Sequence, residues 1–453
     1  MAYDVIVLGG GPGGYSAAEK AGAAGLKTVC IEGRAYGGTC LNEGCIPTKA
    51  LLYSGKMYVH AKEDVYGVHA ENVTIDHNAV IDRKNKVVKT LVSGVEATLK
   101  SKKVEMVKEY GKVVGKGAEG YLVEAGGKTY EGKNLIIATG SVCAIIPIPG
   151  LKEGLASGYV LTNRELLDMR ELPKKLVVLG GGVIGLEMAT YLAMVGVDIT
   201  IIEMLDHIAG NTDKDLVKDL QKSCEKMGMH FILKAKVTEV KADRVVYEKD
   251  GKTMEAEADK VLLSIGRRAN TKDVGLENIG VEMNRGAVVT DEHMKTNVPN
   301  VYAIGDVNAK IMLAHVAYRE ADVAVNNILG IKDVMRYNAV PSVIYTLPEL
   351  SSVGETEESA KAKGIDVRVI KLPMSYSGRF LVENEGVRGT MKLVFNKKYD
   401  TLIGAQFLCN YSSEFVAICA GYIEMELTAK DIQQIIMPHP TVAEIIREAV
   451  NQY

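Results

Sequence analysis

The chain has 453 residues, which is enough for about three domains that each bury their own hydrophobic core. Hydrophobic residues make up 47% and charged residues 25% of the sequence, as in an ordinary soluble globular protein. The formal net charge is −3 and no long basic run occurs, which argues against nucleic acid or a membrane surface as the partner. A small molecule or another protein is the expected partner.

Cysteine usage predicts a cytoplasmic protein with one redox-active pair. There are seven cysteines, and only Cys40 and Cys45 form a close motif, so a framework of structural disulfides is not expected. The chain starts at a strand-like run without a charged leader or a cleavage site. Leu176 to Ile202 is strongly apolar, but the charges of Glu187 and Asp198 favour a buried strand, turn and helix over a membrane span.

The N-terminal stretch has the pattern of a dinucleotide-binding unit. A short apolar run, Tyr3–Leu8, is followed by a glycine-rich turn, an alanine-rich helix and a second apolar run that ends at Glu32. In such a unit Gly9 makes the turn, Gly11 lets a pyrophosphate approach the backbone, and Gly14 lets helix and strand pack closely. The helix N-terminus faces the phosphate charge, and Glu32 is placed to accept a hydrogen bond from a ribose hydroxyl.

The same unit recurs in the middle of the chain. An apolar strand leads into a second glycine turn with Gly180, Gly182 and Gly185, a helix, and a run that ends at Glu203. Gly9 and Gly180 are 171 residues apart, and so are Glu32 and Glu203. Two dinucleotide sites with a cysteine pair beside the first suggest that a flavin, a nicotinamide and a dithiol exchange electrons in series.

Glu203, at the end of the second unit, also predicts which nicotinamide cofactor is bound. The Glu203 carboxylate would accept a hydrogen bond from a free ribose 2′-hydroxyl and would repel a 2′-phosphate. Residues 204–207 offer no arginine that could neutralise such a phosphate. NAD is therefore favoured over NADP.

The remaining segments predict further elements around these units and a separate C-terminal α+β domain. Before and after the second unit, the expected features are helices in 54–103, strands and turns in 104–133, a buried strand at 135–141, a hinge at Pro147 and Pro149, a hairpin in 234–267, a strand, glycine and acid at 300–306, and a helix at 313–329. From about Arg336, strand-like runs at 342–345, 366–372, 389–395 and 402–408 alternate with helices at 355–363 and 414–425.

The cysteine pair lies in a segment, Gly37 to Lys49, that contains three glycines and a proline. On a regular helix five positions correspond to about 500° of rotation, so the two side chains would point apart. A bent backbone can instead bring Cys40 and Cys45 close enough for a disulfide. The alternative is that both are small buried hydrophobic residues in a helix.

A histidine near the C-terminus is a candidate acid-base group. His439 lies between Pro438 and Pro440, which restrict its backbone, and Glu444 could orient its ring and stabilise its charged form. A lone histidine is more often an ordinary core or surface residue. Dithiol chemistry, however, needs a base to form a thiolate and an acid to protonate the leaving thiol.

Together these motifs resemble those of the pyridine nucleotide-disulfide oxidoreductases. Besides the glycine turns and the cysteine segment, the matching motifs are Ala-Thr-Gly at 138–140, Gly-Arg-Arg at 266–268, Ile-Gly-Asp at 304–306, Tyr-Thr-x-Pro-Glu at 345–349 and His-Pro-Thr-x-x-Glu at 439–444. The resemblance runs from residue 3 to the end in the family's order. It is nearest to the members that oxidise dihydrolipoamide.

The resemblance implies a role for each catalytic candidate. Cys40 resembles the interchange thiol that exchanges with the substrate, and Cys45 resembles the thiol beside the flavin. His439 and Glu444 resemble the acid-base pair, which in this family comes from the other subunit of a homodimer. The implied activity is the oxidation of protein-bound dihydrolipoamide to lipoamide, with electrons passing through the Cys40–Cys45 disulfide and FAD to NAD⁺.

The resemblance also implies the fold, the cofactors and the residues that bind them. The expected fold class is α/β, with two Rossmann-like domains for FAD and NAD and a C-terminal α+β dimerisation domain. The expected boundaries are 1–143 for FAD, 144–266 for NAD, 267–335 for a central segment that completes the FAD site, and 336–453 for the interface domain. Lys49 resembles the lysine near flavin N5, Glu187 resembles its partner, and Asp306 resembles the aspartate that binds the ribityl chain.

The full set of expected cofactor-binding residues comes from the two glycine turns and the later motifs, and no metal site is assigned. It comprises Gly9, Gly11, Gly14, Glu32, Lys49, Thr139, Gly140, Gly180, Gly182, Gly185, Glu187, Glu203, Gly266, Asp306 and Ala314. The implied partner is a lipoyl-carrying protein of a 2-oxo acid dehydrogenase complex or the H protein of glycine cleavage.

Two alternatives remain open. The same fold could reduce another disulfide, as the glutathione, trypanothione and mercuric reductases do. Glu203 disfavours the NADPH that the first two use, and the chain ends without the cysteine pair of the third. The second alternative is a mainly structural subunit of a 2-oxo acid dehydrogenase or glycine cleavage complex, which loss of Cys40, Cys45 or His439 would have favoured.

Overall fold

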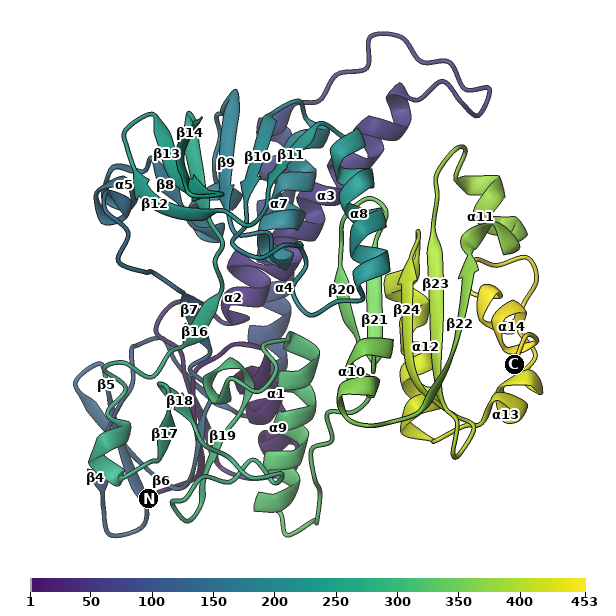
Figure 1. Ribbon diagram of the computed structural model, residues 1–453. Coiled ribbons are helices and arrows are strands. Elements are labelled where there is room, and N and C mark those ends of the chain that lie inside the picture. The colour runs from purple at the N-terminus through teal and green to yellow at the C-terminus, as the bar shows by residue number, and fades with distance from the viewer. Residues whose placement is uncertain (1) are drawn as a thin grey trace. The chain divides into compact units, whose positions relative to one another are not determined.

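The computed structural model describes residues 2–453, which form two compact units (Figure 1). The first unit combines the chain up to Ala50 with Ala79–Ile145 and Gly266–Arg336. The second combines Leu51–Asn78, Ile146–Ile265 and Tyr337–Tyr453. Pro147 and Pro149, which the sequence predicted as a hinge, come directly after the crossing from the first unit to the second.

The sheet of the first unit brings four strand ends to one edge. Its order is β3-β2-β1-β6-β5-β4, and β19 pairs with β6. The strands are β1 (Tyr3–Leu8), β2 (Thr28–Ile31), β3 (Glu105–Val107), β4 (Lys112–Lys116), β5 (Tyr121–Ala125), β6 (Lys128–Ile137) and β19 (Val301–Ala303). Leu8 lies opposite Ile31 and Ile137, and Ile137 lies opposite Ala303. Because these strands are parallel, the segments that follow them all leave from the same edge.

The helices α1 (Pro12–Ala23) and α9 (Ala314–Ile328) pack together in this unit. Lys20 and Asp322 form an ion pair of 2.6 Å between them. A Cβ at Gly13 would lie only 3.4 Å from the Cβ of Ala317, so small residues set the close approach. The central strand β1 is buried from Val5 to Leu8, which agrees with a parallel strand whose two faces are both covered.

The parallel sheet of the second unit repeats this arrangement. Its order is β11-β10-β9-β15-β8, with β8 (Val160–Leu161), β9 (Lys175–Leu179), β10 (Asp198–Ile202), β11 (Met229–Ile232) and β15 (Lys260–Leu263). Leu179 lies opposite Ile202 and Leu263, so the carboxyl ends of β9, β10 and β15 are level. The helices α7 (Val183–Met194) and α8 (Lys214–Lys226) belong to this part of the chain.

The C-terminal part of the second unit is an antiparallel sheet with the order β20-β21-β24-β23-β22. Its strands are β20 (Ser342–Ile344), β21 (Leu350–Gly354), β22 (Val367–Pro373), β23 (Thr390–Asn396) and β24 (Thr401–Leu408). The accompanying helices are α10 (Glu357–Ala362), α11 (Gly378–Glu383), α12 (Ser412–Glu424), α13 (Ala429–Gln433) and α14 (Ile445–Val450). Phe395, Phe407 and Phe415 lie in the core that this sheet shares with its helices.

The remaining elements complete the chain. The helices are α2 (Gly38–Glu43), α3 (Cys45–Lys62), α4 (His77–Ser101), α5 (Leu151–Ser157) and α6 (Asn163–Leu167), with 3-10 turns at Leu276–Ile279, Gly305–Asn308 and Met374–Tyr376. The strands β7 (Ser141–Cys143) and β16 (Arg267–Ala269) pair with each other, as do β17 (Met283–Asn284) and β18 (Ala287–Val288).

The α/β fold class predicted from the sequence is confirmed, and one local prediction is corrected. Residues 234–267 are not a single hairpin, because β12 (Lys236–Val240), β13 (Arg244–Lys249) and β14 (Lys252–Glu257) form a three-stranded sheet. The chain then returns to the parallel sheet as β15, since Lys260–Leu263 pairs with β9. Strand β21 and the helices α11, α13 and α14 were not predicted.

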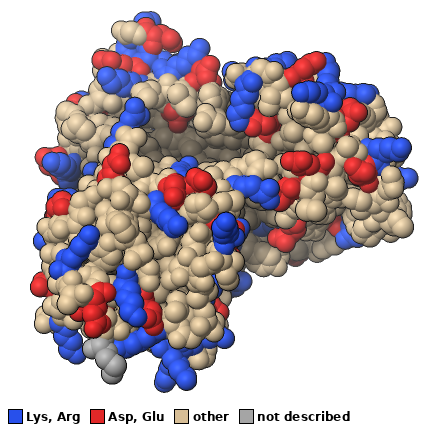
Figure 2. Space-filling view, turned by 90° about the horizontal axis from the view of Figure 1, so that it is seen from below, with Lys and Arg blue, Asp and Glu red and all other residues tan. Residues whose placement is uncertain are grey.

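The surface carries both charges. Figure 2 shows one face, on which lysine and arginine side chains are interspersed with aspartate and glutamate and no single sign covers a large area. Within residues 2–453 the structure has no helix that is both long and apolar enough to cross a membrane.

Candidate active site

The first glycine turn has the geometry that a dinucleotide pyrophosphate requires. Gly9 has φ +110°, and a Cβ there would lie 2.2 Å from the carbonyl oxygen of Ala138. A Cβ at Gly14 would lie 1.8 Å from the carbonyl oxygen of Gly9, so helix α1 could not pack against the turn. Gly11 is different, because a Cβ there would meet nothing closer than Gly38 at 3.8 Å. The space beside Gly11, at the N-terminus of α1, can therefore admit a phosphate.

The second glycine turn repeats these constraints. Gly180 has φ +98°, and a Cβ there would lie 2.8 Å from the carbonyl oxygen of Ser264. A Cβ at Gly185 would lie 2.6 Å from the carbonyl oxygen of Gly180. A Cβ at Gly182 would meet no atom within 4 Å, which leaves the N-terminus of α7 open to a second pyrophosphate.

Glu32 and Glu203 hold the two turns in the same way. In the first unit, the backbone N–H of Gly10 donates to one Glu32 oxygen at 2.7 Å and the N–H of Arg34 donates to the other at 2.8 Å. In the second unit, the N–H groups of Gly181 and Leu205 donate to Glu203 at 2.7 and 2.8 Å. A carboxylate oxygen has two acceptor sites, so each glutamate can still accept a ribose hydroxyl.

Replacing Glu203 is expected to weaken the preference for NADH over NADPH. The Glu203→Gln variant loses a charge whose repulsion of a 2′-phosphate is about 1–2 kcal/mol in a solvated site, so the preference should fall about tenfold. Steady-state kcat/KM for both nucleotides measures this ratio. Glu32→Gln, at the matching position of the first unit, is the control and should leave the ratio unchanged. An unchanged ratio in Glu203→Gln would refute the role of Glu203 as nucleotide selector.

The cysteine pair lies at a break between two helices. Helix α2 ends at Glu43, Gly44 has φ −145° and ψ −108°, and α3 starts at Cys45. This break interrupts the rotation that would separate the side chains on a regular helix, and the Cys45 side chain lies close enough to the Cys40 thiol to affect its pKa. Both cysteines are free thiols in this structure. The hydrogen bond to Cys45 and burial raise the pKa of Cys40.

The dithiol segment rests directly on the first glycine turn. A Cβ at Gly38 would lie 2.5 Å from the Cα of Gly11, so the two backbones touch. The Asn42 side chain donates to the carbonyl oxygens of Gly38 at 2.9 Å and Tyr36 at 3.1 Å, which holds α2 in place. A dinucleotide bound at the first turn would therefore lie close to the thiols.

Two tyrosines that sequence reasoning missed lie near this dithiol. Tyr15 on α1 and Tyr318 on α9 share a hydroxyl–hydroxyl hydrogen bond of 2.5 Å. Burial raises the pKa of both hydroxyls, and the negative charges that Cys40 and Cys45 would carry as thiolates raise it further. Both phenols therefore stay neutral at physiological pH. Their proximity arises from helix packing, for which no local pattern existed.

The segments after β6 and β19 form a connected group at the same edge of the first unit. The Ser141 hydroxyl donates to Asp306 at 2.5 Å, and the Arg267 guanidinium donates to the Ser141 hydroxyl and carbonyl, both at 2.7 Å. The fully buried Glu320 accepts hydrogen bonds from the Gly305 N–H at 2.5 Å and the Asn308 side chain at 3.0 Å. Asp306 is thus fixed from two sides.

The other predicted cofactor residues are distributed between the two units. Thr139 donates its hydroxyl to the Asn270 carbonyl at 2.7 Å, and Gly140 and Gly266 have φ +71° and +117°. Ala314 is the first residue of α9. Lys49 lies in α3 one turn beyond Cys45, in the first unit. Glu187 is buried in α7 of the second unit, where it accepts from the Tyr345 N–H at 3.0 Å.

The structure brings His439 and Glu444 together. Nδ1 of His439 lies 3.1 Å from each Glu444 oxygen, and the Thr441 N–H donates to Glu444 at 2.8 Å. The histidine side chain is 80% exposed and the glutamate side chain 11%. Because the carboxylate favours a proton on Nδ1, the exposed Nε2 is the basic nitrogen.

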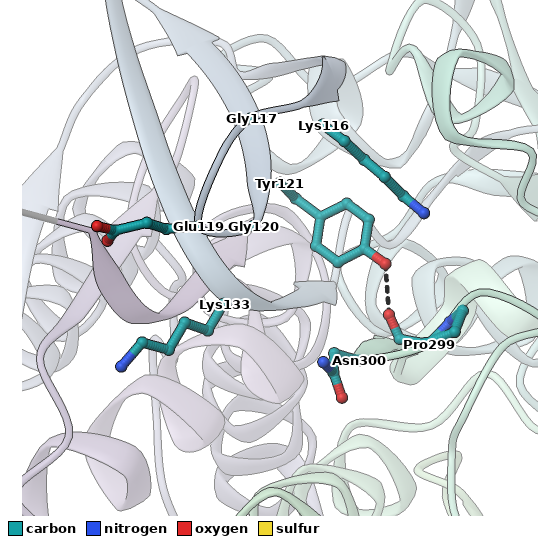
Figure 3. Close-up of a pocket in the computed structure, with 8 residues that line it drawn as sticks. All are labelled: Lys116, Gly117, Glu119, Gly120, Tyr121, Lys133, Pro299 and Asn300. Carbon is teal, nitrogen blue, oxygen red and sulfur yellow. Dashed lines mark hydrogen bonds between the residues drawn. The ribbon is translucent and has the colours of Figure 1, made fainter.

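A pocket of 370 Å³ in the first unit contains none of the predicted site residues. It is lined by Lys116, Gly117, Glu119, Gly120, Tyr121, Lys133, Pro299 and Asn300 (Figure 3). The Tyr121 hydroxyl donates to the Pro299 carbonyl, and the Lys116 ammonium lies 5.4 Å from the centre of the tyrosine ring. Tyr121 and Lys116 therefore already have partners within the lining, and we assign this pocket no function.

Two dinucleotide turns, a dithiol against the first of them and an exposed histidine–carboxylate pair define a flavin- and nicotinamide-dependent disulfide oxidoreductase. A comparison with protein-family models supports this class. The model "Pyridine nucleotide-disulphide oxidoreductase" matches residues 3–321, and the model of that family's dimerisation domain matches residues 340–450. The chain belongs to the pyridine nucleotide-disulphide oxidoreductase family.

Two curated relatives that match nearly the whole chain are both named dihydrolipoyl dehydrogenase. Dihydrolipoyl dehydrogenase from Geobacillus stearothermophilus is 41% identical over 461 residues, with 98% of this chain and 95% of the relative covered. The mitochondrial dihydrolipoyl dehydrogenase of Pisum sativum is 39% identical, with 98% of this chain and 90% of the relative covered.

Among solved structures, LpdA from Mycobacterium tuberculosis has a TM-score of 0.88 and 26% identity. The HOCl-induced flavoprotein disulfide reductase RclA from Escherichia coli has a TM-score of 0.87 and 28% identity. Each of these structural matches covers 99% of both chains.

Proposed function

We propose that this chain is a dihydrolipoyl dehydrogenase, which reoxidises protein-bound dihydrolipoamide to lipoamide and reduces NAD⁺. The observation that carries the proposal is the position of Cys40 and Cys45 on either side of the helix break at Gly44, in a segment that touches the first glycine turn at Gly11. The names of the full-length relatives support the choice of dihydrolipoamide over other dithiols.

The cofactors are FAD and NAD, and the residues present fit both. FAD takes the first turn, where the space beside Gly11 faces the dithiol segment. Thr139 and Gly140 follow β6 and Asp306 follows β19, so these residues leave from the same sheet edge as the turn. Gly266 and Ala314 are assigned to the same cofactor. NAD takes the second turn beside Gly182 and Glu203. The expected FAD, NAD, central and interface domains, 1–143, 144–266, 267–335 and 336–453, remain part of this proposal.

The chain's own residues handle the thiols and the protons. Nε2 of His439 takes a proton from one substrate thiol, and the resulting thiolate attacks Cys40 in the oxidised pair, which breaks the Cys40–Cys45 bond and leaves Cys45 as the thiolate. His439 releases the first proton to solvent and takes the proton of the second substrate thiol, and the resulting thiolate attacks the substrate sulfur bonded to Cys40. Lipoamide is released with its new disulfide, and Cys40 leaves as a thiolate that His439 protonates. Bound FAD supplies the two-electron transfer from the dithiol to NAD⁺.

The proton-transfer group completes the site across a homodimer. His439 lies in the part of the chain that matches the family's dimerisation domain, and its side chain is 80% exposed. Docking of a second copy would bury this ring and bring Nε2 to a partner's dithiol, where it could act out of bulk water. Glu444, which is nearly buried, orients the ring. Lys49, in the same unit as the dithiol, supports the flavin side of the site.

The physiological substrate is a lipoyl group on another protein. The carrier would belong to a 2-oxo acid dehydrogenase complex or to the glycine cleavage system. The cysteine usage of the chain and its kinship to bacterial enzymes favour the cytoplasm as its location.

Paired steady-state assays test this function. The purified yellow protein is supplied with NADH or NADPH and with lipoamide or oxidised glutathione. Turnover with NADH and lipoamide alone is the expected result. Reduction of the flavin by NADH without reduction of lipoamide would leave the fold and cofactors intact and refute the substrate. Turnover with oxidised glutathione would support the glutathione-type alternative.

A further inference from the structure

A buried ion pair joins the dimerisation domain to the nucleotide-binding part of the second unit. The ammonium of Lys392, on β23, lies 3.0 and 2.8 Å from the two oxygens of Asp213. The two side chains are 4% and 0% exposed. Lys392 also lies 2.8 Å from Asp215. Fully buried charges are rare and costly, so this pair holds two segments in one arrangement.

Charge neutralisation explains why the pair is stable. Lys392 lies directly opposite Lys371 on the neighbouring strand β22, which alone would be repulsive. Asp215 accepts from Lys371 at 2.9 Å and so lies between both lysines. Burial works to lower the pKa of Lys392, but the hydrogen bonds to Asp213 and Asp215 outweigh it and raise the pKa. The lysine therefore stays charged and the pair stays formed.

Asp213 also caps helix α8. One of its carboxylate oxygens accepts hydrogen bonds from the backbone N–H groups of Asp215 at 3.0 Å and Leu216 at 3.2 Å. The same oxygen accepts from Lys392. The lysine thereby fixes the point at which α8 begins and the preceding loop ends.

That loop, residues 204–212, contacts the second glycine turn. It follows directly after Glu203, which accepts from the Gly181 N–H at 2.7 Å. Further along, the Ala209 N–H donates to the Gly181 carbonyl at 2.8 Å. The fully buried side chain of Ile208 lies against the same glycine, since a Cβ there would come within 3.0 Å of it. The N–H of Gly181 is thus bound by the residue before the loop, and its carbonyl is bound by the loop itself.

The two units differ in the element that follows the loop beside the glycine turn. In the first unit the Gly10 carbonyl accepts from the Gly37 N–H at 2.8 Å, so the first turn also has its carbonyl bound by a loop that follows the second strand of the unit. That loop continues into the dithiol helix α2. The loop of the second unit continues instead into α8, whose first turn is tied to β23. The dimerisation domain therefore contacts the end of the loop that shapes the second turn.

We propose that Lys392 is a positioning residue for NAD: through Asp213 it fixes loop 204–212, and so sets the affinity of the second glycine turn for the nucleotide. This inference rests on the proposed placement of NAD at that turn. It makes nucleotide affinity depend on a residue of the dimerisation domain that has no contact with the turn itself. The half-reaction between the dithiol and lipoamide does not use this connection.

The test measures NAD⁺ binding to the oxidised FAD-loaded protein by calorimetry, together with kcat/KM for NADH and for lipoamide. Lys392→Met is expected to weaken NAD⁺ binding about tenfold and to lower kcat/KM for NADH to match, while kcat/KM for lipoamide stays within about twofold. Hydrogen exchange of residues 204–212 should rise. Lys371→Met, which removes an exposed partner of Asp215, is the matched control and should leave NAD⁺ binding unchanged. Lys392→Arg should keep most of the affinity.

A second variant separates positioning from a general loss of stability. In Asp213→Asn/Lys392→Met no charge is left buried and unpaired, and asparagine still caps α8, so thermal stability should recover relative to Lys392→Met. The proposal predicts that NAD⁺ binding nevertheless stays weak, because the tie to β23 is absent. Recovery of binding together with stability would overturn it, as would unchanged binding in Lys392→Met. If Lys392→Met does not fold, NAD⁺ binding by the double variant alone tests the proposal. A wild-type protein that binds no NAD⁺ would refute the proposed function and this inference with it.

Discussion

Cys40→Ser and Cys45→Ser variants are expected to lose lipoamide turnover by more than about a thousandfold, because a hydroxyl cannot replace a thiolate in disulfide exchange. Electron transfer from NADH to an artificial acceptor such as a quinone should persist, since it needs only the two dinucleotide sites. Steady-state rates with lipoamide and with the quinone measure the two activities separately.

Thiol titration provides the matching structural readout. Wild-type protein reduced by NADH should expose two more thiols than oxidised protein, and either serine variant should show no such difference. Cys143→Ser is the control, because Cys143 is also partly exposed but lies in β7, outside the cysteine motif. Lipoamide turnover that survives in both variants would contradict the assignment of Cys40 and Cys45 as the redox pair.

The second large effect concerns proton transfer. His439→Gln is expected to lower the lipoamide rate by about a hundredfold to ten-thousandfold, which is the usual size of a general acid–base contribution. The NADH–quinone rate should not change. Glu444→Gln should have a smaller effect, about tenfold, because the amide oxygen can still accept a hydrogen bond and orient the imidazole ring. Equal loss of both rates in His439→Gln would show that the ring acts on structure rather than on proton transfer.

Mixed dimers show whether His439 serves the partner's dithiol. A dimer of one Cys45→Ser subunit and one His439→Gln subunit, isolated with two different tags, contains one intact site if the site is shared between subunits. It should then have about half of the wild-type activity. If each chain supplied its own histidine, both sites would be defective and the mixed dimer would be inactive.

Local patterns predicted the two dinucleotide units well. Strand β1 has the predicted bounds, Tyr3–Leu8, and the two glycine turns match in φ and in hydrogen bonds at the offset of 171 residues between Gly9 and Gly180. These features could be predicted because each depends on residues within one strand, turn and helix. Glycine is the residue that tolerates a positive φ with no room for a Cβ, so its positions carry structural information by themselves.

Local patterns also predicted that the cysteine segment is bent. The break at Gly44 and the contact between the Cys40 and Cys45 side chains agree with the rotation argument. The ring of His439 lies against Glu444, five residues later, because a short segment fixed by two prolines can bring these residues together. In both cases the interacting groups are close in sequence.

The remaining features depend on which distant segments meet. The Tyr15–Tyr318 hydrogen bond joins residues 303 positions apart, and the Lys392–Asp213 pair joins residues 179 apart. Tyr15, Tyr318 and Lys392 carry no local signal, because a tyrosine or a lysine is an ordinary residue in a helix or a strand. Sequence by itself determined the two nucleotide turns, the dithiol and the candidate base. Only the tertiary structure decided which aromatic and charged groups surround them, because those contacts follow from how helices and sheets pack rather than from local backbone preference.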